Sequence, residues 1–176
     1  MYISTRDNYP EIPASRAIKV GMVPTGGLFV PKSIPRFSLE EIGNLVGASY
    51  QTLAEVILSR YLDDYVAEEI RSYVAQAYHE HNFGPPEVTP LRRLGEGLHV
   101  LELWHGPTAA FKDVALQLLP HLLAGAVRKV GSGKEIVILV ATSGDTGKAA
   151  LEGFKDVPGT RIIVFYPFDG VSKVQQ

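Results

Sequence analysis

The sequence contains no cysteine, and this absence alone removes several classes of chemistry. Disulfide frameworks, thiolate nucleophiles and cysteine zinc sites all require a residue that the chain does not have. The chain also has almost no net charge, since 17 basic residues face 19 acidic ones. A balance this even gives no bulk attraction to nucleic acid or to a membrane surface, so we expect neither as a partner.

Long apolar runs are missing as well. The two longest, around residues 114–127 and 136–141, are interrupted by polar residues or are too short to cross a bilayer. The first residues, MYISTRDNYPEIP, lack the basic and apolar regions of a secretory signal. We therefore expect a cytoplasmic protein. With 176 residues, 45% of them hydrophobic, the chain is long enough to bury one core.

The first half of the chain changes character at Ser38. Residues 1–37 are rich in proline and glycine, which favours short strands and turns over helices. Ser38 lies three residues before Glu41, as in a capping box, and apolar residues follow at helical spacing to about Val46. The same spacing predicts two further helices, over 50–62 and 66–79.

Glycine and prolines at 84–86 end this helical region, and we place a boundary near residue 85. The section 1–85 is then a small, mainly helical N-terminal part, and 86–176 begins an α/β domain. Beyond the boundary the pattern alternates between strands and helices. The expected elements are strand 98–103, helix 113–130, strand 135–141, helix 146–154 and strand 161–166.

Such alternation is typical of an α/β fold whose parallel strands are joined by helical crossovers. No helix follows the last expected strand to complete its crossover unit. We therefore expect the α/β domain to be incomplete at its C-terminus.

The first candidate site is the run LWHGPTAAFKD, residues 103–113, which follows the strand expected at 98–103. Lys112 is expected at a strand-to-helix junction, where parallel sheets usually bind ligands. The positive end of a helix disfavours an ammonium there, which favours an amine able to form a Schiff base. The alternative is an ordinary solvated lysine. His105 is either a proton-transfer or phosphate-binding group, or a structural hydrogen-bonding partner.

The second candidate site is ATSGDTGKAA, residues 141–150, directly after the apolar strand. Gly144 and Gly147 allow a tight turn, Asp145 or Thr146 can cap the next helix, and free N–H groups at its start can bind an anion. The alternative is a plain strand-to-helix turn. The runs that end in Gly133-Lys134 and Gly147-Lys148 do not fit a Walker A loop, and neither candidate site contains a dinucleotide fingerprint. The remaining histidines lack carboxylate partners at ligand spacing, so we predict no metal site; they are His79, His81, His99 and His121.

Four motifs, in order and spacing, resemble the threonine synthase family: YISTR, PTGGLFVP, LWHGPTAAFKD and SGDTG. The resemblance spans nearly the whole chain. It implies a fold-type II pyridoxal 5′-phosphate enzyme, a carbon–oxygen lyase that converts O-phospho-L-homoserine and water to L-threonine and phosphate.

By this resemblance, Lys112 attaches the cofactor and then moves protons at the substrate carbons. Phe111 and Asp145 lie against the cofactor. The substrate is bound by the SGDTG loop, His105 and Thr108, and that loop holds the substrate carboxylate; its residues are Ser143, Gly144, Asp145, Thr146 and Gly147. Many relatives have asparagine in place of Asp145, so backbone N–H groups are the better candidates for the anion contact. The alternatives are a threonine synthase-like phospho-lyase, which releases a keto acid, and a folded module without catalysis.

The resemblance also implies that two parts of the site are absent from these 176 residues: the glycine-rich loop for the cofactor phosphate and the residue that faces the pyridine nitrogen. Much of the binding energy and orientation of the cofactor is then missing. We predict that the purified 176-residue chain alone has no threonine synthase activity. Threonine or phosphate formation above a buffer control would refute this prediction.

Overall fold

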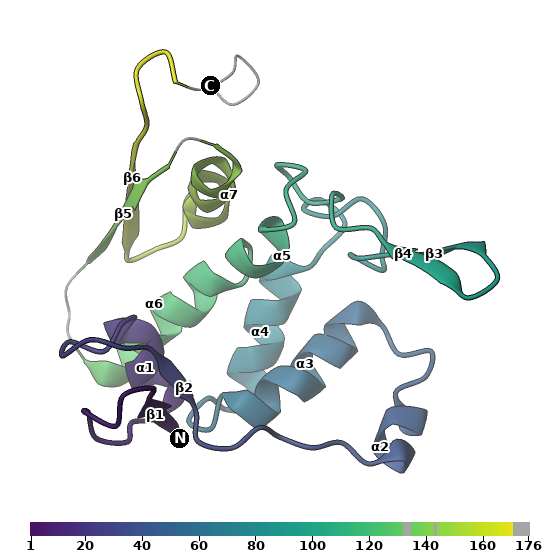
Figure 1. Ribbon diagram of the computed structural model, residues 1–176, viewed down its shortest axis with the longest axis horizontal. Coiled ribbons are helices and arrows are strands. Elements are labelled where there is room, and N and C mark those ends of the chain that lie inside the picture. The colour runs from purple at the N-terminus through teal and green to yellow at the C-terminus, as the bar shows by residue number, and fades with distance from the viewer. Residues whose placement is uncertain (132–134, 143, 171–176) are drawn as a thin grey trace.

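The computed structural model describes residues 1–131, 135–142 and 144–170. Figure 1 shows a small N-terminal unit with α1, a central group of helices, a projecting hairpin, and a two-stranded sheet with its own helix. In chain order the elements are β1 Tyr2–Ser4, α1 Ala14–Val20, β2 Phe29–Pro31, α2 Leu39–Asn44, α3 Tyr50–Tyr61, α4 Ala67–Ala77, β3 Leu91–Gly95, β4 Leu98–Leu101, α5 Asp113–Leu116, α6 Leu119–Val130, β5 Ile136–Ala141, α7 Asp145–Phe154 and β6 Thr160–Phe165.

The N-terminal unit combines an antiparallel pair, β1 with β2, and helix α1. The expectation of strands and turns is confirmed for β1 and β2 but wrong for α1. This helix follows Pro13 and has no N-cap side chain of its own. Two aspartates from the distant α3–α4 loop replace it. Asp63 accepts the Ala14 N–H at 3.0 Å, and Asp64 accepts the Ser15 N–H at 3.1 Å and its hydroxyl. Local sequence carries no sign of a cap supplied from so far away.

Asp63 also binds the ammonium group of Met1. Burial alone would raise the pKa of the Asp63 carboxyl, but hydrogen bonds from this ammonium and from Ala14 lower it below its usual value. Folding therefore favours the carboxylate. The stabilisation is present above the pKa of the unfolded chain and is lost as the pH falls through the folded value.

The three predicted helices of the first half are confirmed as α2, α3 and α4. The capping box at the start of α2 is formed in both directions. Ser38 Oγ accepts the Glu41 N–H at 3.1 Å, and Glu41 Oε2 accepts the Ser38 N–H at 2.7 Å. Helix α2 buries none of its residues and projects from the central group in Figure 1.

The hydrophobic core lies where α4 packs on α6. At this contact a Cβ on Gly125 would lie 2.5 Å from the Tyr73 hydroxyl oxygen, so glycine lets α6 approach the ring. The core unites residues from α1 to α6, on both sides of position 85; its buried members are Ala14, Leu62, Tyr65, Ile70, Tyr73, Val74, Ala77, Tyr78, Phe83, Val88, Leu118 and Leu122.

The parallel part of the predicted sheet is confirmed for β5 and β6, which are joined through α7. The strand expected at 98–103 is not part of it. It is shorter, as β4, and pairs antiparallel with β3, an unpredicted strand. The turn Glu96–Gly97 connects them, and Gly97 adopts a φ of 69°, as tight hairpins require. Strand β4 therefore pairs with its neighbour in sequence, β3, and not with the parallel strands as predicted.

The single helix expected at 113–130 is divided into α5 and α6. Pro120 lies in the first turn of α6. It has no N–H to donate, and its ring would clash with the carbonyl four residues back, that of Leu116. Helix α5 accordingly ends at Leu116. Among the described residues, no helix is long and apolar enough to cross a membrane.

The capping of α1 across the fold can be tested with Asp64→Ala. Ser15 is 2% exposed, and the change leaves its N–H and hydroxyl without their acceptor. We expect the free energy of unfolding, measured by urea denaturation, to fall by about 1–3 kcal/mol. Glu96→Ala, in the exposed hairpin turn, is the control and should change it by less than about 0.5 kcal/mol. An equal effect of both variants would contradict the capping role.

Candidate active site

Lys112 lies at the end of the loop that connects β4 to α5, in the N-cap position of that short helix. Its side chain is half-buried, and its Nζ lies 4.3 Å from the centre of the Phe111 ring. Within the described ranges it forms no ion pair. Because α5 has only four residues, the helix-dipole argument for this lysine loses most of its basis. The groups that surround the Lys112 side chain are instead the Phe111 ring and the walls of a hollow.

That hollow has a volume of about 610 Å³ and opens beside Lys112. Its walls are mainly apolar and come from the C-cap of α4, the β4–α5 loop, α5 and α7. The lining residues are Tyr78, Leu103, Phe111, Lys112, Val114, Ala115, Leu116 and Thr146. Lys112 from the first candidate site and Thr146 from the second thus meet at one cavity, although 34 positions separate them in sequence.

Asp113 holds the loop before Lys112 in shape, and it was not among the predicted site residues. It is fully buried. Its two carboxylate oxygens accept the Thr108 N–H at 2.9 Å and the Thr108 hydroxyl at 2.7 Å. A Cβ on Gly106 would lie 2.4 Å from the Asp113 Cβ, so only glycine fits there. The Thr108 hydroxyl, predicted to bind substrate, is therefore engaged inside the protein.

His105 has a carboxylate partner that the sequence did not reveal. Its Nε2 lies 2.6 Å from Glu102 Oε2, and both side chains are largely buried. Arg92 on β3 lies 3.8 Å from the same carboxylate oxygen. His105 is not among the residues that line the hollow beside Lys112. The pairing matches the structural interpretation of His105 and leaves its role toward substrate a proposal.

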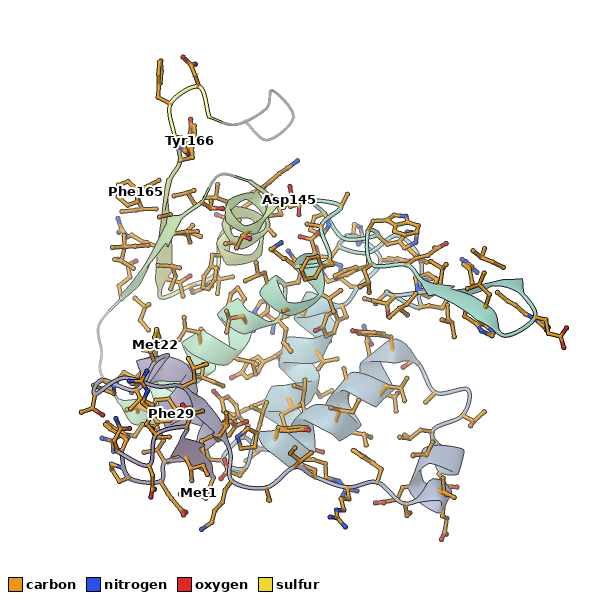
Figure 2. The ribbon with its side chains drawn as sticks, in the orientation of Figure 1. Met1, Met22, Phe29, Asp145, Phe165 and Tyr166 are labelled. Atoms are coloured by element: carbon orange, nitrogen blue, oxygen red, sulfur yellow. The ribbon has the colours of Figure 1, made fainter. Side chains whose placement is uncertain are left out.

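The second candidate site is the turn from β5 into α7. Ser143 lies outside the described residues. Gly144 is the N-cap, without a side-chain cap bond, and its N–H donates to Thr142 Oγ1 at 3.3 Å. The expected cap from Asp145 or Thr146 is therefore wrong, because both lie inside the first turn with exposed side chains. Figure 2 shows Asp145 at the end of α7 nearest the loop that leads into α5.

Gly147 serves packing rather than the turn. A Cβ at this position would lie 2.1 Å from Thr142 Cγ2 and 3.2 Å from Val164 Cγ1. Glycine therefore lets the first turn of α7 lie directly on the ends of β5 and β6. The start of this ten-residue helix is held at the carboxyl edge of the parallel pair.

A second glycine of α7 brings the two sites together. Gly153 faces α5, and a Cβ there would lie 2.1 Å from the Leu116 carbonyl oxygen. Helices α5 and α7 consequently touch backbone to backbone, as Figure 1 shows for their neighbouring ribbons. The sequence contains this glycine, but nothing in its local pattern indicates which helix it faces.

Tyr78 ties α5 to the central helices and was also missed. Its hydroxyl donates to the Val114 carbonyl at 2.7 Å, and its ring lines the hollow. Burial, together with the neighbouring Tyr50, raises the pKa of the Tyr78 phenol, so it remains a hydrogen-bond donor at neutral pH. Where the chain is described, no three potential ligands gather into a metal site.

Comparisons with known proteins agree in sequence and in structure. A family model for the threonine synthase N terminus matches residues 1–78. Threonine synthase from Pseudomonas aeruginosa is 41% identical, over 99% of this chain and 37% of its own length. Mouse threonine synthase-like 1 is 40% identical, over 99% of this chain and 25% of its own.

Among solved structures, pyridoxal-phosphate-bound threonine synthase from Brucella melitensis superposes with a TM-score of 0.93 and is 39% identical. The match covers 99% of this chain and 37% of that one. The chain thus spans little more than a third of the length of the threonine synthases it resembles.

The contact that joins the two sites can be tested with Gly153→Ala. The added methyl group meets a backbone carbonyl that cannot rotate away, so α7 must move from α5. We expect the free energy of unfolding to fall by about 1–3 kcal/mol in chemical denaturation. Gly43→Ala in α2, where a Cβ meets open space, is the matched helical control and should be neutral or stabilising. Indistinguishable variants would show that the two helices do not depend on this contact.

Proposed function

We propose that this chain, which resembles the N-terminal part of threonine synthases in sequence and in fold, supplies one wall of the active site of such an enzyme. In the complete protein, Lys112 attaches pyridoxal 5′-phosphate, and the start of α7 holds the substrate carboxylate. The reaction converts O-phospho-L-homoserine and water to L-threonine and phosphate, as expected for a carbon–oxygen lyase of amino-acid biosynthesis.

The observation that carries this proposal is the meeting of Lys112 and Thr146 at one apolar hollow. A pyridine ring fits a cavity walled by Leu103, Phe111 and Ala115 better than it fits open water. Lys112 is a half-buried residue that lines this space, and within the described ranges no carboxylate forms an ion pair with its amine. A lysine of this kind is suited to condense with an aldehyde.

Each residue of the proposed site has a role that follows from its position. The cofactor, when bound, takes up the negative charge that develops on the substrate carbons. Lys112 would hold the cofactor and would carry protons between those carbons. Phosphate leaves the γ carbon, and water adds at the β carbon. Asp113 and Thr108 keep the loop before Lys112 closed, so the amine returns to one position.

The substrate carboxylate is assigned to the backbone at the start of α7. The first N–H groups of a helix lack helical acceptors and attract anions, although Gly147 N–H already donates to Gly144. The Asp145 side chain is exposed in this first turn and carries charge of the wrong sign for such a contact. Asp145 toward the cofactor, and Ser143 and His105 toward the substrate, complete the proposed set.

A second function has one specific observation in its favour, the 40% identity with mouse threonine synthase-like 1. The alternative activity is that of a phospho-lyase, which would share Lys112 but release a keto acid. Parallel assays of the complete protein for threonine and for α-ketobutyrate separate these two activities.

Attachment at Lys112 can be tested on the chain itself by limiting pyridoxal phosphate, borohydride reduction and peptide mass spectrometry. Reduction traps even a weakly held Schiff base, so detection does not require tight binding of the cofactor. We expect the label mainly on Lys112, and at least tenfold less total label in Lys112→Ala.

Lys148→Ala is the matched control, because Lys148 is an exposed lysine in the first turns of α7. Its loss should leave the label on Lys112 unchanged. Equal labelling of Lys112 and the exposed lysines would overturn the assignment.

A further inference from the structure

The loop that leads into Lys112 contains a residue in a strained backbone conformation. Ala109, three positions before Lys112, has a φ of 57°. Residues with a Cβ rarely adopt this left-handed region, because the Cβ comes too close to the following carbonyl oxygen. Among the described residues the other non-glycine cases are three aspartates, a residue type that tolerates this region, and Val88, which lies outside the loop. Such strain persists only where surrounding contacts hold it, and it is concentrated near functional sites.

Two hydrogen bonds close the chain directly around Ala109. The Thr108 N–H and hydroxyl both donate to the fully buried carboxylate of Asp113, at 2.9 and 2.7 Å. Ala109 and Lys112 lie inside the segment that these bonds close, together with Ala110, which is 7% exposed. We call this pair of bonds the first clamp. While it is intact, Ala109 cannot relax its backbone without pulling Ala110 out of the interior.

A second contact holds the start of the same loop. The Glu102 N–H donates to the Pro90 carbonyl at 2.9 Å, and the Glu102 carboxylate lies 2.6 Å from His105 Nε2. An ionised carboxylate can only accept, so Nε2 carries the proton of this bond. We call the pair Glu102–His105 the second clamp. It fixes the position of the next residue, Gly106, whose carbonyl accepts the Ala109 N–H at 3.1 Å.

We propose that Ala109 is a positioning residue for Lys112: its left-handed backbone, held by the two clamps, directs the chain so that Lys112 lines the hollow. This inference rests on the proposed function, because it takes Lys112 as the lysine that attaches the cofactor. When a clamp is broken, the strain at Ala109 favours relaxation of the backbone, and Lys112 leaves its position. Glycine at position 109 has no Cβ and therefore no such drive to relax. A clamp that only supported the fold would gain nothing from glycine at this position.

The strain itself can be measured by thermal unfolding of the 176-residue chain. Ala109→Gly should raise the Tm by about 1–4 °C, because it removes the Cβ from a left-handed position. Ala75→Gly is the matched control at an exposed position inside helix α4. It should lower the Tm by about 2–4 °C, since glycine disfavours a helix interior. A loss of Tm in Ala109→Gly as large as in the control would show that the loop is not strained and would overturn the inference.

The positioning role is tested by rescue. Thr108→Val removes the hydroxyl of the first clamp and keeps the shape of the side chain. After labelling with limiting pyridoxal phosphate and borohydride, we expect the share of label on Lys112 to fall about fivefold or more, because the amine has left its position. The double variant Thr108→Val with Ala109→Gly should return this share to within about twofold of the unmodified chain. Thr108→Ser, which keeps the hydroxyl, should stay within the same limit.

A second variant and a second measurement keep the test decisive where Thr108→Val does not fold. Glu102→Ala opens the second clamp at a side chain that is 18% exposed, and its effect should likewise be reversed by Ala109→Gly. Glu96→Ala, in the exposed hairpin turn, is its control and should leave the label on Lys112 unchanged.

Hydrogen–deuterium exchange follows the loop without any cofactor. Amides of residues 103–112 should exchange about fivefold faster when either clamp is opened, and at nearly the original rate after Ala109→Gly is added. Unchanged exchange in the clamp variants, or exchange that glycine at 109 does not slow, would overturn the inference. Label spread evenly over the lysines of the unmodified chain counts against the proposed function alone, because the exchange rates still decide whether the clamps hold the loop.

Discussion

The backbone contact between Gly153 of α7 and the Leu116 carbonyl of α5 determines where the candidate site can form. Lys112 is the N-cap of α5 and Thr146 lies in the first turn of α7. The distance between these two helices therefore sets how close the two motifs can come. A side chain at position 153 would separate them by the width of a methyl group. The hollow beside Lys112 is therefore a property of helix packing, and neither loop could create it alone.

The helix that carries Lys112 is short because Pro120 ends it, and short helices are poorly held by their own hydrogen bonds. Other parts of the fold hold it instead. The Tyr78 hydroxyl donates to the Val114 carbonyl, and the buried Asp113 accepts hydrogen bonds from Thr108 in the loop before α5. Strong positioning of Lys112 thus comes from side chains of neighbouring elements, which is the usual way in which a reactive group is kept in one orientation.

The sheet end of the molecule has the opposite character. Its covered face is closely packed against α7, where Gly147 allows direct contact, while its outer face presents large apolar side chains to solvent. Helix α7 therefore contacts the sheet through Gly147 and the helix that follows Lys112 through Gly153.

The sequence alone determined the features that depend on neighbouring residues. The capping box at Ser38, the period of helices α3 and α4, the apolar strands β5 and β6, and the two candidate motifs were all predicted, because each is written within a few consecutive positions. Contacts between distant residues decided the rest. Asp63 and Asp64 cap α1 although they lie 49 positions away in sequence. Strand β4 pairs with β3 in a hairpin and not with the parallel strands. Gly153 allows α7 to pack closely on α5, so that Thr146 and Lys112 lie at one cavity. Such features could not be predicted from local pattern, because their free energy arises only when the chain has folded and the partners meet.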